Sequence, residues 1–110
     1  MEPTFETHAT GGWTVVRIAG ELDLATSAAL RSALESGFAR DTPRLAVDLT
    51  EVTFMDSSSL GVLVAYLKRA REQAGDLMLV GVQGSPAKVI SLTGLDAVFR
   101  IEDSVADLPA

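Results

Sequence analysis

The residues best placed to do chemistry in this chain are three consecutive serines, Ser57 to Ser59, directly after Asp56. They separate a short apolar stretch from an amphipathic one, which predicts a strand, a turn and then a helix. Asp and Ser are favoured at helix starts because their oxygens accept hydrogen bonds from the first backbone N–H groups. These N–H groups and the helix dipole also favour a negative charge, including a phosphate. We therefore expect a displayed serine hydroxyl that tolerates phosphorylation.

A second acidic group, Asp23, ends the segment Gly20-Glu21-Leu22-Asp23, between a predicted strand and a predicted helix. Taken alone, this segment is a loop with an acidic approach to a helix start. If the strands before Asp23 and Asp56 are neighbours, the two carboxylates would flank one hydroxyl. Both would then stand at the carboxyl ends of strands, where open α/β sheets place their sites.

Three other interpretations of the serine turn each require different neighbouring residues. A helix cap needs nothing more than Asp56 and one serine. A serine hydrolase needs a base, but the only histidine is His8, in a predicted edge strand, and the Gly-x-Ser-x-Gly elbow is absent. A metal site needs more oxygen ligands than Asp23 and Asp56 supply. We therefore predict no catalytic residue, no cofactor and no metal, and a binding module rather than an enzyme.

The coarse pattern alternates strands with helices, which predicts a single α/β domain over residues 1–110. Its sheet is expected to be mixed, mostly parallel and packed with about four helices. Gly20 is expected to end a strand, and Ser85 and Pro86 to be the N-cap and first residue of a helix. The predicted strands are 4–9, 13–19, 44–49, 52–54, 77–82 and 98–101, and the predicted helical segments start near 25–27, 57, 85 and 104.

The helix predicted from Ser57 to Gln73 has two faces. One carries apolar residues at i, i+3, i+4 and i+7 and should face the core. The other is small and partly apolar, and we expect it to point away from the core and suit a partner. The core face comprises Leu60, Leu63, Val64 and Leu67, and the second face comprises Ser58, Gly61, Val62, Ala65 and Arg69. Val89, Ile90 and Leu92 should form the apolar side of the next helix.

Composition narrows the classes of partner. The formal net charge of −6 argues against nucleic acid and anionic membranes, which bind through Lys and Arg. No cysteine is present, which removes disulfides and thiol chemistry. The start of the chain lacks the basic and apolar segments of a signal peptide, and no apolar run is long enough to span a membrane. We expect a cytoplasmic protein, and nothing demands more than a monomer.

With these residues in place, the chain resembles the STAS-domain family, and within it the bacterial anti-sigma factor antagonists. The combination of Gly-Glu-Leu-Asp with Phe-Met-Asp-Ser-Ser at this distance is the specific part of the resemblance. The segments that carry it are 17–23, 45–49, 52–58 and 91–95.

The resemblance implies a phosphorylation switch. In this family an anti-sigma factor kinase with a histidine-kinase-like ATPase fold phosphorylates the serine after the Asp, which here is Ser57, with Ser58 and Ser59 as other possible acceptors. The unphosphorylated antagonist binds the kinase and frees a sigma factor. A metal-dependent serine phosphatase reverses the modification. Asp23 matches a loop acid at the partner interface. The expected partner-binding residues are Asp23, Asp56, Ser58, Ser59, Gly61, Val62 and Ala65.

One residue departs from the family pattern, which usually has glycine where this chain has Ser59. Its side chain is expected to stand where the kinase approaches and to offer a second acceptor. Two alternatives stay open within the family. One is an unphosphorylated scaffold or transporter-accessory subunit, and the other is a small-ligand sensor that uses the crevice at the strand ends.

Overall fold

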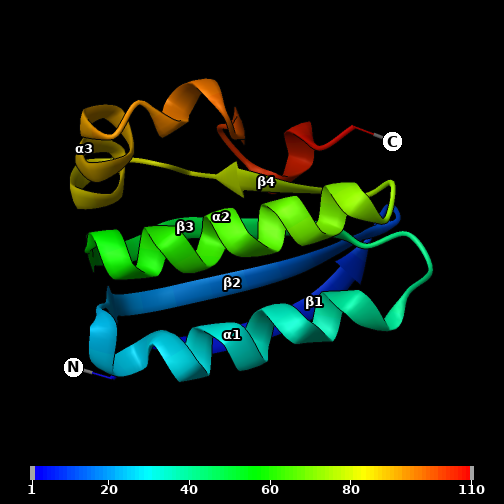
Figure 1. The fold of residues 1–110 in the computed structure, drawn as a ribbon, viewed down its shortest axis with the longest axis horizontal. Helices are drawn as coiled ribbons and strands as arrows, with labels where there is room; N and C mark the ends of the chain where they lie inside the picture. The colour runs from blue at the N-terminus through cyan, green and yellow to red at the C-terminus, as the bar shows by residue number, and fades with distance from the viewer. Residues whose placement is uncertain (1, 110) are drawn as a thin grey trace.

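The computed structural model describes residues 2–109 and consists of one five-stranded sheet covered by helices (Figure 1). The strand order is β1-β2-β3-β4-β5, with β1 antiparallel to β2 and every other pair parallel. This α/β architecture confirms the predicted mixed, mostly parallel sheet. The strands are β1 (Thr4–Thr10), β2 (Trp13–Leu22), β3 (Arg44–Met55), β4 (Asp76–Val80) and β5 (Arg100–Glu102).

Helices fill most of the connections between the parallel strands. Three of the described segments are α-helices, against the four helices predicted, and the remaining turns are short 3-10 segments. The α-helices are α1 (Ser27–Glu35), α2 (Ser57–Glu72) and α3 (Gly84–Leu92), and the 3-10 turns are η1 (Leu24–Thr26), η2 (Ser36–Ala39), η3 (Leu95–Ala97) and η4 (Val105–Asp107). Within residues 2–109, no helix is both long enough and apolar enough to cross a membrane.

The main core lies between the sheet and the helices α1 and α2, which run side by side over it (Figure 1). Leu30 and Leu34 of α1 and Leu60, Leu63 and Leu67 of α2 are almost fully buried there. Burial of each leucine side chain contributes about 1.5–3 kcal/mol, so α2 is fixed firmly on the sheet. The predicted core stripe of this helix is therefore confirmed at its leucines.

The other face of the sheet carries a smaller core that the C-terminal segment covers. Val105 and Leu108 pack against it, and the Trp13 Nε1–H donates a 2.7 Å hydrogen bond to the Pro109 carbonyl. The buried residues of this second core are Trp13, Val15, Ala46, Met78 and Val80. The part of this face nearer β1 stays uncovered and charged.

The long central strands differ from the prediction. β2 does not end at Gly20 but continues to Leu22 through an irregular step in its pairing with β3. Gly20 adopts φ +109°, and a Cβ there would lie 3.1 Å from the Pro3 Cα, so the step needs glycine. The predicted strands 44–49 and 52–54 form the single strand β3, because β2 pairs with it along almost its whole length.

The start of α3 also differs from the prediction. The helix begins at Gly84 after the N-cap Gln83, so Ser85 is not its cap. The Ser85 hydroxyl instead accepts a 3.1 Å hydrogen bond from the Met55 N–H. This bond satisfies part of β3 that extends beyond β4, and α3 covers that part. Leu92 is 78% exposed rather than part of the apolar side, because it lies at the free end of the helix.

Candidate functional site

The candidate site lies where β2 and β3 end together. Leu22 pairs with Met55, and the Asp56 N–H donates a 3.2 Å hydrogen bond to the Leu22 carbonyl. The residues that follow, Asp23 and Asp56, therefore begin two adjacent turns. The prediction that the two turns adjoin at the carboxyl edge of the sheet is confirmed.

Asp56 is the N-cap of α2, and one of its oxygens organises the serine turn. Its Oδ1 accepts hydrogen bonds from the Ser59 N–H at 3.0 Å and from the Ser59 hydroxyl at 3.2 Å. The same atom accepts from the Ser58 hydroxyl at 2.6 Å. The Leu60 N–H donates to the Asp56 carbonyl at 3.2 Å. Asp56 thus uses two of the three serines to close the start of the helix.

Ser57 is the serine that this network leaves out. It is exposed, and among residues 2–109 its hydroxyl has no hydrogen-bond partner. The neighbouring backbone N–H groups of Ser57 and Ser58 lack acceptors within the same residues. A free hydroxyl beside free N–H groups at a helix start can take an anionic modification, because those N–H groups can donate to it.

Hydrogen bonds keep the Asp56 carboxylate charged. Partial burial raises the pKa of Asp56, but the bonds donated by Ser58 and Ser59 outweigh it, so the pKa lies below the usual 3.8. The Leu24 backbone amide of η1 acts in the same direction. A carboxylate that accepts this many bonds holds its negative charge at neutral pH.

Asp23 organises the neighbouring turn in the same way. Its carboxylate accepts from the Thr26 N–H at 3.1 Å, and its own N–H donates to the Thr26 hydroxyl at 2.9 Å. The Ser27 hydroxyl donates to the Asp23 carbonyl at 3.3 Å. The hydrogen bonds of Asp23 thus hold its own turn, and those of Asp56 hold Ser58 and Ser59. The two carboxylates lie on adjacent turns, but neither accepts a hydrogen bond from the Ser57 hydroxyl. The expectation that they flank this hydroxyl is therefore not met by direct hydrogen bonds.

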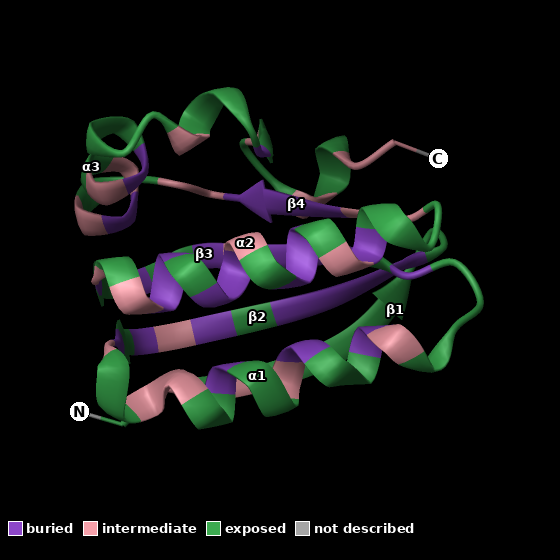
Figure 2. Cartoon of the chain, in the orientation of Figure 1, coloured by how far each residue is buried: buried purple, intermediate pink, exposed green. Residues whose placement is uncertain are grey.

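The outer face of α2 is narrower than predicted (Figure 2). Gly61 and Ala65 are exposed, but Val62 is only 3% exposed and Ser59 is fully buried. The prediction that Val62 points away from the core is therefore wrong, as is the expectation that the Ser59 side chain meets an approaching partner. The reason is that α2 packs on α1 as well as on the sheet: the Tyr66 hydroxyl donates a 2.6 Å hydrogen bond to Glu35 of α1.

His8 cannot serve as a base for these serines. It pairs with Val15, seven residues before Leu22, which places it about 20 Å from the site along β2. The single histidine therefore lies too far from the serine turn to act as its base. Among residues 2–109, no three acidic or histidine side chains gather as a metal site requires.

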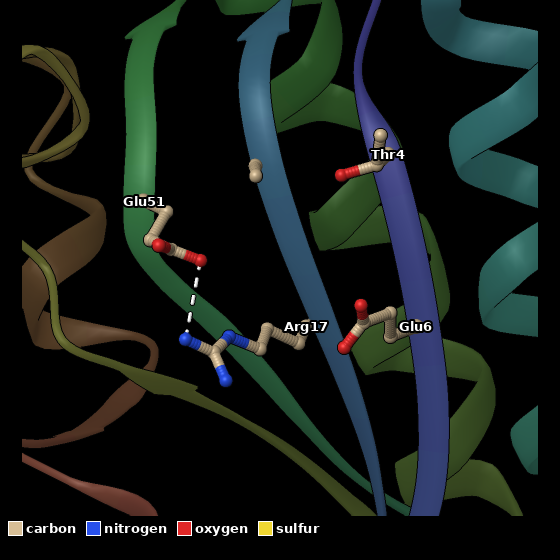
Figure 3. A pocket seen from close by; sticks show the side chains of 5 residues that line it. Thr4, Glu6, Arg17 and Glu51 are labelled. Carbon is tan, nitrogen blue, oxygen red and sulfur yellow. Dashed lines mark ion pairs between the residues drawn. The ribbon is translucent and has the colours of Figure 1, made fainter.

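Two surface hollows lie on the face of the sheet opposite α1 and α2, away from the serine turn. One of about 200 Å³ is lined by β1, β2 and β3, and Figure 3 shows its Arg17 guanidinium turned toward Glu51, 3.2 Å away. Another of about 490 Å³ lies between this face and the C-terminal segment. Neither is lined by Asp23, Asp56 or Ser57.

One feature of the site was missed from the sequence. Leu24, the first residue of η1, is 75% exposed although it lies between the two capped turns. In the sequence, the exposure of Leu24 is indicated only by its place directly after the cap residue Asp23, where a short turn leaves side chains uncovered.

The comparisons with known proteins agree with this fold. Residues 4–108 match the STAS domain model, so the chain belongs to the STAS domain family. An anti-sigma-B factor antagonist of Listeria monocytogenes is 35% identical over 86 residues, which is 78% of this chain and 75% of that protein. An anti-sigma factor antagonist structure from Mycobacterium paratuberculosis superposes with a TM-score of 0.85 at 31% identity, covering 96% of this chain and 90% of that one.

A third similarity concerns the fold alone. The Bacillus cell fate determinant SpoIIAA in its phosphorylated form has a TM-score of 0.72 at 21% identity, covering 94% of this chain and 95% of that one. The family-model match and the Listeria and Mycobacterium relatives confirm the predicted family and its anti-sigma factor antagonist branch.

Proposed function

We propose that this chain is an anti-sigma factor antagonist whose binding is switched off by phosphorylation of Ser57. The observation that carries the proposal is the selective hydrogen bonding at the serine turn. Asp56 occupies the hydroxyls of Ser58 and Ser59, and the Ser57 hydroxyl is exposed without a partner among residues 2–109. A kinase needs an accessible hydroxyl, and Ser57 meets that condition better than its two neighbours. The relatives named as antagonists support the same class.

The switch would act through charge rather than refolding. A phosphate on Ser57 adds about −1.5 to −2 charges at pH 7. A negative charge at the start of a helix is stabilised by about 0.3–1 kcal/mol, so the phosphorylated chain should stay folded. The phosphate would join the charged carboxylate of Asp56, and burying such unpaired charge at an interface costs about 2–5 kcal/mol. That cost lowers affinity roughly 30-fold to several-thousand-fold, because each 1.4 kcal/mol is tenfold.

The proposed contact surface is the exposed strip around Ser57. It includes the exposed residues Gly61 and Ala65 of α2 and the two acidic turns at Asp23 and Asp56. Ser58 lies at its margin, half-buried. Ser59 and Val62 are left out because they are buried. Small residues on a rigid helix let a partner backbone approach closely, and the acids favour a basic partner surface.

The proposed partners are an anti-sigma factor serine kinase, which the unphosphorylated chain binds, and a metal-dependent serine phosphatase, which removes the phosphate. In this scheme the chain is a substrate and a regulatory binding protein, not an enzyme, and works in the cytoplasm as a monomer. The fold is compatible with a phosphate, since SpoIIAA has been solved in a phosphorylated form.

Intact-mass measurement tests the site. The chain is incubated with Mg-ATP and the anti-sigma factor kinase encoded nearest to it, and phosphorylated fragments are mapped. We expect one phosphate on Ser57, lost in Ser57→Ala and kept in the matched variants Ser58→Ala and Ser59→Ala. A phosphate on Ser58 or Ser59 would move the site. No phosphate on a folded chain that also fails to bind the kinase would overturn the proposed function.

A further inference from the structure

We propose that Leu24 is an apolar anchor of the surface around Ser57, inserted into a pocket with a basic rim on the anti-sigma factor kinase. This inference rests on the proposed function and adds a residue that determines which kinase is recognised. The starting observation is that Leu24 is 75% exposed beside the serine turn, whereas most large apolar side chains of this chain are buried. The apolar area it leaves in water is available to a partner.

Leu24 is held rigidly in its exposed position. The residue before it, Asp23, is tied to Thr26 by two hydrogen bonds, and Leu22 is fully buried at the end of β2. The Thr26 hydroxyl adds a 3.1 Å bond to the Asp23 carbonyl. The backbone of a turn fixed in this way loses little conformational freedom on binding, which favours its use to present an anchor. Figure 2 shows the start of this turn, after β2, in the colour of exposed residues.

Leu24 is also continuous with the serine turn. The Asp56 N–H bonds the Leu22 carbonyl at 3.2 Å, and η1 contacts α2 directly. A partner that covers Ser57 therefore meets Leu24 on the same edge of the sheet. Covering Leu24 in that interface would remove its apolar surface from water, which favours binding.

The charges around Leu24 indicate the chemistry of the partner. Glu21 and Asp23 precede it, and Asp56 begins the adjacent turn. Two copies of this chain would bring these acids together, and each copy carries a net charge of −6, so self-association through Leu24 is disfavoured. A pocket with Lys or Arg at its rim fits both the leucine and the acids. In the proposed function the partner with such a pocket is the kinase.

The test compares two exposed leucines. Leu24→Ala removes the anchor. Leu92→Ala is the matched control, because Leu92 is 78% exposed and belongs to α3. Figure 1 shows α3 on the other side of α2 from α1. Affinity for the kinase is measured by calorimetry, and phosphorylation is followed in steady state. We expect Leu24→Ala to bind tenfold or more weakly, and Leu92→Ala to bind like the parent chain. For phosphorylation, Leu24→Ala should raise KM with kcat unchanged, because the anchor contributes equally before and during phosphate transfer.

The outcomes separate this inference from the proposed function. If the parent chain is phosphorylated on Ser57 and Leu24→Ala binds as tightly as the parent, the anchor is refuted and the switch stands. Equal losses for Leu24→Ala and Leu92→Ala would also refute a specific anchor. If the parent chain neither binds the kinase nor accepts phosphate, both proposals fail together.

Discussion

The two turns at the carboxyl ends of β2 and β3 use the same capping chemistry and leave different groups exposed. In the first, Asp23 bonds Thr26 and Ser27, and the exposed group is the apolar Leu24. In the second, Asp56 bonds Ser58 and Ser59, and the exposed group is the hydroxyl of Ser57. One turn thus presents an apolar contact and the other presents a modifiable oxygen.

The difference teaches that the cap carboxylate decides which hydroxyl is available. A single serine after an Asp is ambiguous between cap and site. Here three serines follow Asp56, and the helix geometry brings the second and third within reach of its Oδ1. The turns also differ in support: η1 contains no buried residue, whereas α2 is packed on the sheet and on α1.

The largest expected effect is on partner binding by Ser57→Asp. A carboxylate at position 57 should lower affinity for the kinase by about 30-fold or more. The complex would bury its negative charge without a partner. Calorimetry measures the affinity, and circular dichroism checks that the fold is kept. Ser91→Asp supplies the same charge at an exposed position on α3 and should bind like the parent chain. Parent-like binding by Ser57→Asp would contradict the switch.

The two cap residues should differ in their effect on stability. Asp56→Ala loses a cap and leaves the fully buried Ser59 hydroxyl without its acceptor, which should cost about 2–4 kcal/mol. Asp23→Ala loses only the cap of a turn without buried residues, at about 1 kcal/mol. Urea unfolding measures both values.

A second substitution isolates the buried hydroxyl. In the Asp56→Ala background, Ser59→Ala should restore about 1–2 kcal/mol, because it removes the buried hydroxyl that lost its acceptor. Equal destabilisation by Asp56→Ala and Asp23→Ala, with no recovery from Ser59→Ala, would show that the turns are equivalent.

The lowered pKa of Asp56 predicts a dependence on pH. A carboxyl whose pKa is lower in the folded than in the unfolded state stabilises the fold above its usual pKa of 3.8. That contribution is lost as the pH falls through the lower, folded value. The stability gap between the parent chain and Asp56→Asn should therefore narrow as the pH falls below 3.8. Urea midpoints across this range check it, and a constant gap would contradict the assignment.

The smallest expected effect belongs to Ser57→Ala. The Ser57 hydroxyl has no partner among residues 2–109, so its removal should change the free energy of unfolding by no more than about 0.5 kcal/mol. Ser58→Ala, which removes the 2.6 Å bond to Asp56, should cost more. The same urea measurement compares them. A larger loss for Ser57→Ala than for Ser58→Ala would show that Ser57 is a structural residue.

Local chemistry made much of the fold predictable. Alternating apolar residues identified the strands, and the leucines of α2 identified its buried stripe. The Asp56 cap was also predictable, since a carboxylate before a helix bonds the N–H groups just after it. These features depend on residues within one or two turns of each other. The adjacency of Asp23 and Asp56 was expected only on condition that β2 and β3 pair.

Features that depend on distant partners were missed. Gly20 is typical of a strand end, but its neighbour Pro3 and its pairing with β3 make it a bulge inside β2. Ser85 has the local context of a cap, yet it bonds the Met55 N–H, 30 residues away in the chain. Val62 was assigned to the outer face because the packing of α2 on α1 cannot be read from helical periodicity.

The sequence by itself determined the elements, the cap and the family, because these follow from neighbouring residue types and from motifs at fixed spacing. Only the tertiary structure decided that Ser57 is the free hydroxyl and that Leu24 is exposed beside it. Which oxygen accepts which proton depends on angles and distances in three dimensions. Whether an apolar side chain is covered depends on what packs over it from elsewhere in the chain.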